Sequence, residues 1–312
     1  MNDTIDTLPL VSVIIPTYNH GAYLDAAIDS VLRQDYPHVE LIVLDDGSTD
    51  DTPQRLDKYA GRFYIERHAN MGQAGTINKG WALARGEILS YLGADDCLLP
   101  HAVSLSVSQL RAHEDAVMTY GDFNLIDPAS KMIRRVSTPE FSYFELVVRL
   151  VCAPGPGVFL RRDAVERAGG WDTQLQQIPD FEYWMRLGLQ GRFLRIPEVL
   201  ANYRTHERSP SFGPVDYARA EEPIRVVGEY YRRQDPPAQI RAGRKRALSN
   251  AHVLSARLHL RAGRFARAVV LLWRALRLYP GNCFDVRTWR LILNGLTNQS
   301  VHRVVWALNR LR

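Results

Sequence analysis

Two short apolar runs in the N-terminal third of the chain each end in a pair of adjacent aspartates. Leu41–Leu44 precede Asp45–Asp46, and Ile88–Ala94 precede Asp95–Asp96. A short apolar run bounded by turn residues is typical of a strand buried in the middle of a sheet. In open α/β sheets, ligands bind beyond the carboxyl ends of such strands. The four carboxylates are therefore predicted to converge on one crevice, where a metal-bound, phosphorylated ligand would offset their mutual repulsion.

Apolar runs and amphipathic helical patterns alternate over residues 10–120. Strands are expected at 10–15, 40–44, 62–65, 88–94 and 116–120, with helical patterns between them. Such alternation indicates right-handed βαβ units. We therefore predict an α/β fold with a Rossmann-like, mostly parallel central sheet flanked by helices. Residues 122–205 are more mixed and are expected to continue this domain as one wall of a cleft.

The pattern changes after about residue 215 and becomes almost wholly helical. Within this part, Gly263, Phe265, Ala268, Ala275 and Pro280 resemble a single tetratricopeptide-type helix pair. We therefore expect two domains. Residues 1–215 would form the α/β domain, and residues 216–312 a helical C-terminal region with this one helix pair and a basic amphipathic end.

The net charge of +5 is concentrated near the C-terminus. From Arg232 to Arg312 the only acidic residues are Asp235 and Asp285. The last stretch combines apolar residues with arginines: Trp289, Leu291, Ile292, Leu296, Val301, Val304, Val305, Leu308 and Leu311 with Arg287, Arg290, Arg303, Arg310 and Arg312. This asymmetry favours an anionic partner, namely nucleic acid, acidic lipid or a phosphorylated acceptor. A solvated, arginine-rich helical face is the alternative.

Composition narrows the class of protein. The chain is 46% hydrophobic and 23% charged, which is typical of a globular protein. Three scattered cysteines are too few for a disulfide framework or a zinc site, which favours a reducing compartment. The acidic N-terminus does not resemble a secretory signal, and no apolar stretch approaches the ~18 residues of a membrane span. We expect a cytoplasmic protein that can attach peripherally to the inner face of a membrane.

Several ordered blocks of sequence resemble family 2 glycosyltransferases with the GT-A fold. The resemblance covers about residues 9–208. Its blocks are Val11–Asn19, Val43–Asp50, Gly72–Gly80, Leu92–Asp96, Gly169–Asp172 and Asp180–Leu187. It implies inverting transfer of a sugar from a nucleotide-sugar donor, assisted by a divalent cation.

The resemblance places the donor's base and ribose at the ends of the first two strands. Thr17, Tyr18 and Asn19 would border the base, and Asp46 would accept a hydrogen bond from it. Asp45 is expected to bond to neighbouring backbone amides instead. Tyr18 as a core aromatic and Asp46 as an Asx-turn are the alternatives. The full donor-binding set implied is Thr17, Tyr18, Asn19, Asp46, Gly72, Asn78, Asp95 and Arg204.

Asp95 and Asp96 stand where the family carries its acidic metal motif. The resemblance implies that Asp96 binds the ion directly and that Asp95 contacts the sugar or ribose. A hard divalent ion, Mg²⁺ or Mn²⁺, suits carboxylate ligands and would offset charge on a diphosphate leaving group. His206 would complete the metal shell or contact a phosphate, or it is structural. Gly93 replaces an acid that the family often carries.

Inversion needs a base that takes the proton of the acceptor hydroxyl. Asp180 matches the family's base, although Pro179 precedes it where the family commonly has Glu. Glu182 is the rival candidate, but on a helix it would point away from Asp180.

One cationic position of the family pattern has changed. Ile77 stands where relatives often carry an arginine that faces the diphosphate. Arg204 or Lys79 would have to compensate for that loss.

The expected activity is transfer of a sugar, with UDP-sugars favoured, to a glycan or lipid-linked acceptor in cell-surface polysaccharide synthesis. A catalytically weak or inactive binding or scaffold protein of the same fold is the alternative, because Ile77, Gly93 and Pro179 depart from the family pattern. A nucleotidyltransferase would need a glycine-rich phosphate loop after the first strand, which is missing. Nucleic-acid binding is not expected, since no recognition module accompanies the basic helices.

Overall fold

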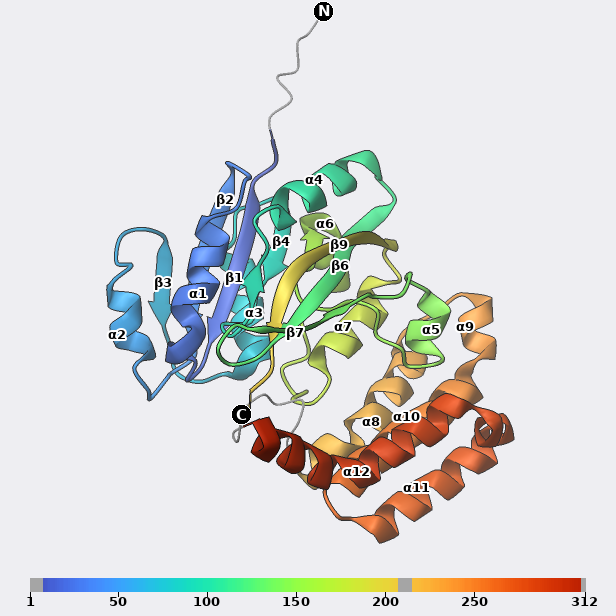
Figure 1. Cartoon of the computed structure of the whole chain (residues 1–312). Helices are drawn as coiled ribbons and strands as arrows, with labels where there is room; N and C mark the ends of the chain where they lie inside the picture. Colours follow the sequence, from blue (N-terminus) through green and yellow to red (C-terminus); the bar gives the residue numbers. More distant parts are fainter. Residues whose placement is uncertain (1–7, 207–214, 310–312) are drawn as a thin grey trace, which may run out of the picture. The chain divides into compact units, whose positions relative to one another are not determined.

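The computed structural model describes residues 8–206 and 215–309, with side chains described up to residue 297 at the C-terminal end (Figure 1). The chain forms two compact units. The first, here called the sheet unit, consists of Met1–Phe141, Ala153–Gln174 and Arg186–Glu207. The second, the helical unit, consists of Ser142–Cys152, Leu175–Met185 and Arg208–Arg312. Each unit is therefore built from segments that alternate along the sequence.

The sheet unit is organised around one mixed sheet, in which the described residues form nine strands. Their order is β3-β2-β1-β4-β8-β6-β9-β5, and β7 pairs with the outer part of β6. The strands are β1 (Val11–Thr17), β2 (Val39–Asp45), β3 (Tyr64–Arg67), β4 (Ile88–Tyr91), β5 (Cys97–Leu98), β6 (Ala116–Ile126), β7 (Met132–Val136), β8 (Phe159–Arg161) and β9 (Arg192–Arg204). The four strands β3, β2, β1 and β4 are all parallel to one another.

Both faces of β1 are buried, which explains its continuous apolar sequence. Successive side chains of a strand point to opposite faces. Val13 and Ile15 belong to a cluster with residues of α1 (Gly21–Leu32) and α4 (Ala102–Ala112). Ile14 faces the other way, onto α3 (Gly72–Leu83), where a side chain at Gly80 would lie 2.5 Å from its Cγ2. Of the shorter helices, α2 (Thr52–Asp57) packs against α1, and α6 (Arg162–Ala168) packs against β8 (Figure 1).

The sheet changes direction beyond β4. β8 is antiparallel to both β4 and β6, so β6 runs in the direction of β4 without pairing to it. The predicted fold class, an α/β sheet flanked by helices with a helical C-terminal part, is confirmed. Within it, parallel pairing is confined to β3-β2-β1-β4 and to β6-β9. The short strand β8 comes from the mixed region 122–205, where the local pattern does not specify a partner.

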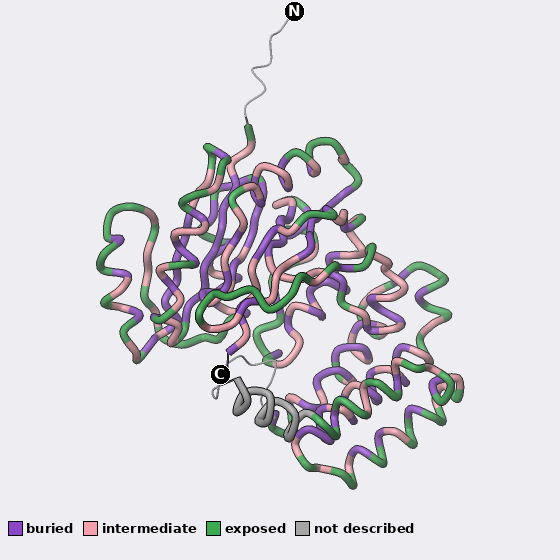
Figure 2. The backbone as a smooth tube through the Cα atoms, viewed as in Figure 1, coloured by how far each residue is buried: buried purple, intermediate pink, exposed green. Residues whose placement is uncertain are grey.

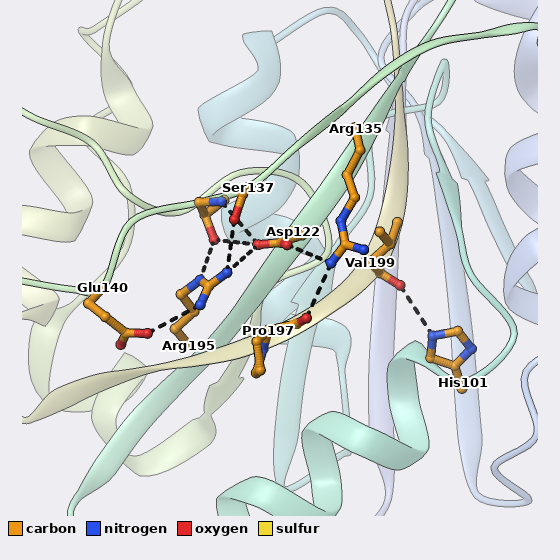
Figure 3. A network of polar contacts seen from close by, with 9 residues as sticks. His101, Asp122, Arg135, Ser137, Glu140, Arg195, Pro197 and Val199 are labelled. Atoms are coloured by element: carbon orange, nitrogen blue, oxygen red, sulfur yellow. Dashed lines mark hydrogen bonds and ion pairs between the residues drawn. The ribbon is translucent and has the colours of Figure 1, made fainter.

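A buried carboxylate ties together the strands at this end of the sheet. Asp122 of β6 accepts hydrogen bonds from Arg135 of β7 at 2.8 Å, from Arg195 of β9 at 2.8 Å, and from the Thr138 N–H at 3.0 Å (Figure 3). Arg195 also pairs with Glu140. Burial alone would raise the pKa of Asp122, but these hydrogen bonds outweigh it and lower the pKa to about 2.

The helical unit contains α5 (Tyr143–Val147), most of α7 (Pro179–Leu187), and the C-terminal helices. These are α8 (Tyr217–Arg233), α9 (Ala238–Ala242), α10 (Arg244–Arg261), α11 (Phe265–Leu278), the 3₁₀ turn Pro280–Phe284 and α12 (Val286–Asn309). α10 and α11 pack as a pair through Ala256, Leu260, Ala268 and Leu271. Gly263 lies between them with a φ of 72°, a conformation that favours glycine.

Segments distant in sequence are bonded to each other inside the helical unit. The Tyr143 hydroxyl lies 2.5 Å from the Tyr230 hydroxyl, and Asn250 donates to the Val148 carbonyl at 2.8 Å. The expected domain boundary after residue 215 lies within this unit, and residues 142–152 and 175–185 belong to it as well. Among the described residues, no helix is both long enough and apolar enough to cross a membrane. The predicted basic end from 298 onward lies outside the described side chains.

Candidate active site

The predicted donor residues follow the carboxyl ends of β1 and β2. The two strands pair along their full length, with Val11 opposite Val39 and Thr17 opposite Asp45. The Asp46 N–H then donates to the Thr17 carbonyl at 2.9 Å. Because parallel strands end at the same edge of a sheet, the loops that begin at Tyr18 and Asp46 lie side by side.

Asn19 joins these two loops. It has a φ of 58°, a conformation that asparagine tolerates better than most residues. Its side-chain oxygen accepts hydrogen bonds from the N–H groups of Thr49 and Asp50, and its own N–H donates to the Ser48 hydroxyl at 2.9 Å. The neighbouring Tyr18 ring is 45% exposed, so it is not a core aromatic. Asn19 therefore holds the two loops together, and the Tyr18 side chain is open to solvent.

The first aspartate pair is buried and bonded to backbone amides. Asp45 accepts from the Ser48 N–H at 2.9 Å, which is the role expected of it. Asp46 accepts from the Met71 N–H at 2.6 Å with one oxygen and from the Gly72 N–H at 3.0 Å with the other. Asp46 thus holds the turn that starts α3, and Gly72 adopts a φ of 79° there.

Asn78 bonds to a backbone segment of the same unit. Its side-chain amide donates to the Trp171 carbonyl at 2.9 Å and accepts from the Trp171 N–H at 2.7 Å. A side chain at Gly170 would lie 2.8 Å from the Asn78 oxygen, so glycine is needed there. Asn78 therefore fixes the Gly169–Asp172 block.

The second aspartate pair lies between β4 and β5 and meets the end of β9. Asp95 Oδ2 lies 3.0 Å from His206 Nε2, and Asp96 Oδ1 accepts from the Arg204 N–H at 2.9 Å. His20, which follows β1, approaches the same place, with its ring 5.8 Å from that of His206. The candidate ligand atoms of His20, Asp95 and His206 all lie within 4.8 Å of one another.

The two carboxyl groups of this pair have opposite pKa shifts. Burial, reinforced by the negative charge of Asp95, raises the pKa of Asp96 well above its ordinary value. Burial also acts on Asp95, but the hydrogen bond from His206 and the charge of His20 outweigh it and lower the pKa of Asp95. Asp95 is therefore the carboxylate of the pair that ionises more readily.

These residues fit a divalent cation. Two imidazoles and one carboxylate within 4.8 Å of one another can share one ion. A side chain at Gly93 would lie 2.9 Å from Asp95 Oδ1 and 3.1 Å from Asp96 Oδ2, so glycine leaves space between the carboxylates. Of the two expected metal ligands, His206 belongs to this candidate group and Asp96 does not. Among the described residues, its other two members are Asp95 and His20.

Arg204 lies beside Asp95 and Asp96, and its guanidinium is hydrogen-bonded to other groups of the protein. Its side chain is almost fully buried. Its guanidinium donates to the carbonyls of Asp95 and Asp127 and to the Ser130 hydroxyl, and lies 4.8 Å from the Tyr23 ring centroid. Arg204 therefore braces the loop that carries the aspartate pair.

The other candidate cation, Lys79, is paired as well. Its Nζ lies 2.6 Å from Glu66. Ile77, on the same helix, is fully buried. At position 77, where the family resemblance implies an arginine, α3 therefore has a buried isoleucine. The positive charge of Lys79 on the same helix is paired with Glu66.

The predicted base, Asp180, belongs to the helical unit. It lies in the first turn of α7, half-buried, and accepts from the Phe181 N–H at 2.8 Å. Burial raises the pKa of Asp180, although this hydrogen bond opposes the shift. The rival Glu182 lies in the same turn and is also half-buried.

A buried glutamate holds the loop that leads into α7. Glu222 of α8 accepts from the N–H groups of Gln176, Gln177 and Ile178 at 2.9, 2.7 and 3.2 Å. Three backbone donors converge on one carboxylate, so the entry into the helix of Asp180 is fixed from within the same unit.

The structure thus brings together Asp95, Asp96, Arg204 and His206, and separately joins Asp46 to Gly72. Three contributors were missed by sequence reasoning: His20, Tyr23 and Glu222. His20 directly follows the Thr17–Asn19 motif, and that adjacency was the available signal. Tyr23 and Glu222 act through contacts between segments far apart in sequence, which no local pattern reveals.

The sequence profile of the family described as "Glycosyl transferase family 2" matches residues 12–169, half of the chain. The chain therefore belongs to glycosyltransferase family 2, as the resemblance indicated. It is 32% identical over 213 residues to an uncharacterized glycosyltransferase of Nostoc sp., covering 63% of this chain and 65% of that protein. It is 29% identical over 232 residues to the chondroitin synthase of Escherichia coli, covering 72% of this chain and 33% of the synthase. The chain thus spans less than two thirds of the length of these relatives.

Solved structures share the fold at low identity. S. aureus TarS 1-349, in complex with UDP-GlcNAc, gives a TM-score of 0.68 at 16% identity, covering 94% of this chain and 91% of that one. The mannosyltransferase PcManGT of Pyrobaculum calidifontis, in complex with GDP-Man and Mn²⁺, gives 0.60 at 19% identity, covering 96% and 88%. The predicted GT-A fold is confirmed.

Proposed function

We propose that the chain is an inverting glycosyltransferase that moves a sugar from a nucleotide-diphosphate sugar to a glycan or lipid-linked acceptor in cell-surface polysaccharide synthesis. The observation that carries this proposal is the convergence of His20, Asp95 and His206 beside Asp96, at the carboxyl edge of the sheet of a family 2 chain. The chondroitin synthase relatives support a polysaccharide product, and the UDP-GlcNAc bound to TarS supports a UDP-sugar.

The sheet unit would bind the donor. Tyr18 offers an exposed ring to the nucleobase at a wall that Asn19 and Asp46 hold in shape. His20, Asp95 and His206 would hold the divalent ion. When bound, that ion supplies positive charge to the diphosphate as the glycosidic bond breaks. Mn²⁺ is favoured over Mg²⁺, because Mg²⁺ prefers oxygen ligands and two of these three ligands are imidazoles.

The helical unit would supply the base. Asp180 would take the proton of the acceptor hydroxyl while that oxygen forms its bond to the anomeric carbon. The bond from that carbon to the diphosphate breaks on the opposite side, and its electron pair leaves with the nucleotide. A raised pKa makes Asp180 a stronger base than an ordinary aspartate. Attack from the face opposite the leaving group gives inversion.

A cytoplasmic location at an anionic membrane surface is part of the proposal. The lipid-linked acceptor would be found there, and the arginine-rich C-terminal helices would suit such a surface.

Metal binding in the absence of donor tests the central site directly. We expect the His20→Ala and His206→Ala variants each to bind Mn²⁺ at least about tenfold more weakly than the wild type by isothermal titration calorimetry. His38→Ala, which removes an exposed histidine of the same unit, is the matched control and should bind normally.

Donor turnover is the second readout. Hydrolysis of a panel of UDP- and GDP-sugars with Mn²⁺ should be lost in Asp95→Ala and retained in Asp57→Asn, an exposed aspartate on α2. Turnover in Asp95→Ala equal to the wild type would refute the proposed site. Stronger turnover of GDP-sugars would refute the UDP preference alone.

A further inference from the structure

The helix α11 carries apolar side chains on two of its faces. Ala268, Leu271 and Ala275 form the buried face, which packs against α10. A second stripe consists of Phe265, Val269, Trp273 and Leu276, whose exposed fractions range from 40 to 64%. At 100° per residue these four positions fall within an arc of about 80°, so they form one continuous ridge. We call it the α11 stripe.

At the same 100° per residue, Arg277 lies about 40° beyond the edge of this stripe, while Arg274 lies about 100° beyond it, toward the buried face. Arg274 and Arg277 are both exposed, and the Arg277 guanidinium lies 4.0 Å from the Trp273 ring centroid. The sequence of α11 contains no aspartate or glutamate. From Arg244 to Arg312 the one acidic residue is Asp285, which pairs with Arg149 at 3.3 Å and with Arg246 at 3.8 Å.

Glu221 of α8 also contacts α11, but its carboxylate pairs with Arg267 and with His259. Arg274 and Arg277 therefore leave positive charge on the exposed side of α11.

The beginning of α12 repeats the pattern. Its exposed side chains Val286, Trp289, Leu293 and Leu296 also fall within an arc of about 80°. Phe284, just before the helix, is 89% exposed, and Arg290 is exposed beside Trp289. Along both helices, exposed positions alternate with buried ones in Figure 2. Two separate helices thus expose tryptophan and leucine, with an exposed phenylalanine on α11 and another just before α12.

We propose that the α11 stripe, together with the exposed residues at the start of α12, docks the chain onto a bilayer that contains anionic phospholipid. Aromatic and aliphatic side chains would enter the boundary between headgroups and acyl chains. Arg277, at the edge of the stripe, would bind a lipid phosphate, and Arg274, farther round the helix, would add attraction at longer range. This assignment rests on the proposed function, because a lipid-linked acceptor is presented at such a surface.

The positive charge beside the α11 stripe favours an anionic bilayer, rather than a second copy of the chain, as its binding partner. A two-fold interface would bring the same stripe of both copies together. Arg277 of each copy would then lie at the edge of that interface without an acid on α11 to neutralise it. An anionic bilayer complements both the apolar ridge and its arginine border.

Vesicle co-sedimentation of the full chain tests the proposal. The wild type should bind vesicles of phosphatidylcholine mixed with phosphatidylglycerol, more weakly at high salt, and bind poorly to phosphatidylcholine alone. Trp273→Glu should reduce binding at least about tenfold, because a large apolar side chain is replaced by a charge that the headgroups repel. Arg274→Glu together with Arg277→Glu should reduce it as well.

Ile133→Glu is the matched control. Ile133 is 57% exposed on β7, similar to Trp273 at 53%, but lies in the sheet unit, and its variant should bind vesicles normally. Since all the substituted side chains are exposed, the melting temperatures of the variants should match the wild type. Any variant that melts earlier would be replaced by Phe265→Glu, at an independent position of the stripe.

Several results would overturn the docking surface. They are absence of wild-type binding, equal binding to neutral vesicles, normal binding by Trp273→Glu, or an equal loss in Ile133→Glu. A wild-type dimer in analytical ultracentrifugation that Trp273→Glu dissociates would assign the stripe to self-association instead. Donor hydrolysis is the separate readout of the proposed function: Trp273→Glu should retain it, so failure of hydrolysis and failure of docking are distinguishable.

Discussion

The half-buried side chain of Asp180 must be ionised to act as the proposed base. Its raised pKa means that the folded protein binds its proton more tightly than the unfolded chain does. The stability contributed by that proton is complete below the unfolded pKa and is lost as the pH rises through the raised one. At neutral pH the ionised side chain therefore costs stability, while it supplies the base.

Replacing Asp180 by Asn should separate these two effects. We expect the transfer rate to fall roughly a thousandfold, with donor affinity unchanged, because the base is lost and the donor residues are not. The melting temperature at neutral pH should stay the same or rise. In the wild type, kcat should increase with pH through the raised pKa of Asp180. Glu182→Gln is the comparison, and an equal loss of rate in that variant would assign the base to Glu182.

At the scale of elements, Glu222 links α8 to the loop before α7. Its carboxylate accepts three backbone N–H groups from residues 176–178. Glu222→Gln replaces one acceptor oxygen by an NH₂ group that cannot accept any of them. Displacement of the loop should lower kcat by about tenfold, since small misplacements of a reacting group are costly.

The donor KM of Glu222→Gln should not change, because the donor residues belong to the sheet unit. Glu229→Gln, on the same helix and paired with Arg232 and Arg233, is the control and should retain full kcat. An increase in donor KM with an unchanged kcat would contradict the positioning role of Glu222.

Asp122 of β6 links three strands, because its carboxylate accepts hydrogen bonds from Arg135 of β7 and Arg195 of β9 (Figure 3). Its pKa of about 2 lies below that of an unfolded aspartate, so its contribution to stability is complete above about pH 4 and is lost as the pH falls through about 2. Asp122→Asn should lower the free energy of unfolding by about 2 kcal/mol at neutral pH.

Urea unfolding at a series of pH values measures this contribution. The difference between the wild type and Asp122→Asn should shrink as the pH is lowered from about 4 toward 2. A difference that stays constant over this range would show that the Asp122 charge does not stabilise the sheet. Asp57→Asn should behave as the wild type throughout.

At the scale of the whole molecule, the alternation of segments between the two units limits how the chain can be divided. The domain boundary after residue 215, expected from the sequence, remains a prediction. A chain of residues 1–215 would lose Tyr230, Asn250 and Glu222, the partners of segments 142–152 and 175–185. The Val148 carbonyl and the N–H groups of residues 176–178 would lose these hydrogen bonds, while Tyr143 would keep its bond to the Met185 carbonyl. A buried polar group left without a partner costs about 1 to 3 kcal/mol.

We therefore expect the truncated chain to melt without cooperativity or to aggregate, as judged by differential scanning calorimetry. Co-expression with residues 216–312 should restore a cooperative transition. A soluble 1–215 chain with a wild-type thermal shift on donor addition would instead support the boundary after residue 215.

Much of the fold could be predicted from local pattern. The strands at 10–15 and 40–44 and the helix after Gly21 follow from apolar runs and periodicity, which act between near neighbours. The location of the two aspartate pairs at the carboxyl edge of the sheet could be predicted because each pair follows a strand. The insertion of β8 between β4 and β6 could not be predicted, because a three-residue strand carries no information about its partner.

The same division holds for the site. The sequence by itself determined the family, the edge of the sheet where the donor residues gather, and the carboxylates available there. Only the tertiary structure decided which groups each carboxylate contacts. Asp46 binds the turn before α3, and Asp95 lies beside the two histidines. Asp96 accepts from the backbone N–H of Arg204, and Glu222 binds the loop before α7. The physical reason is that a side chain's charge and pKa depend on burial and on partners that the fold brings from distant parts of the chain.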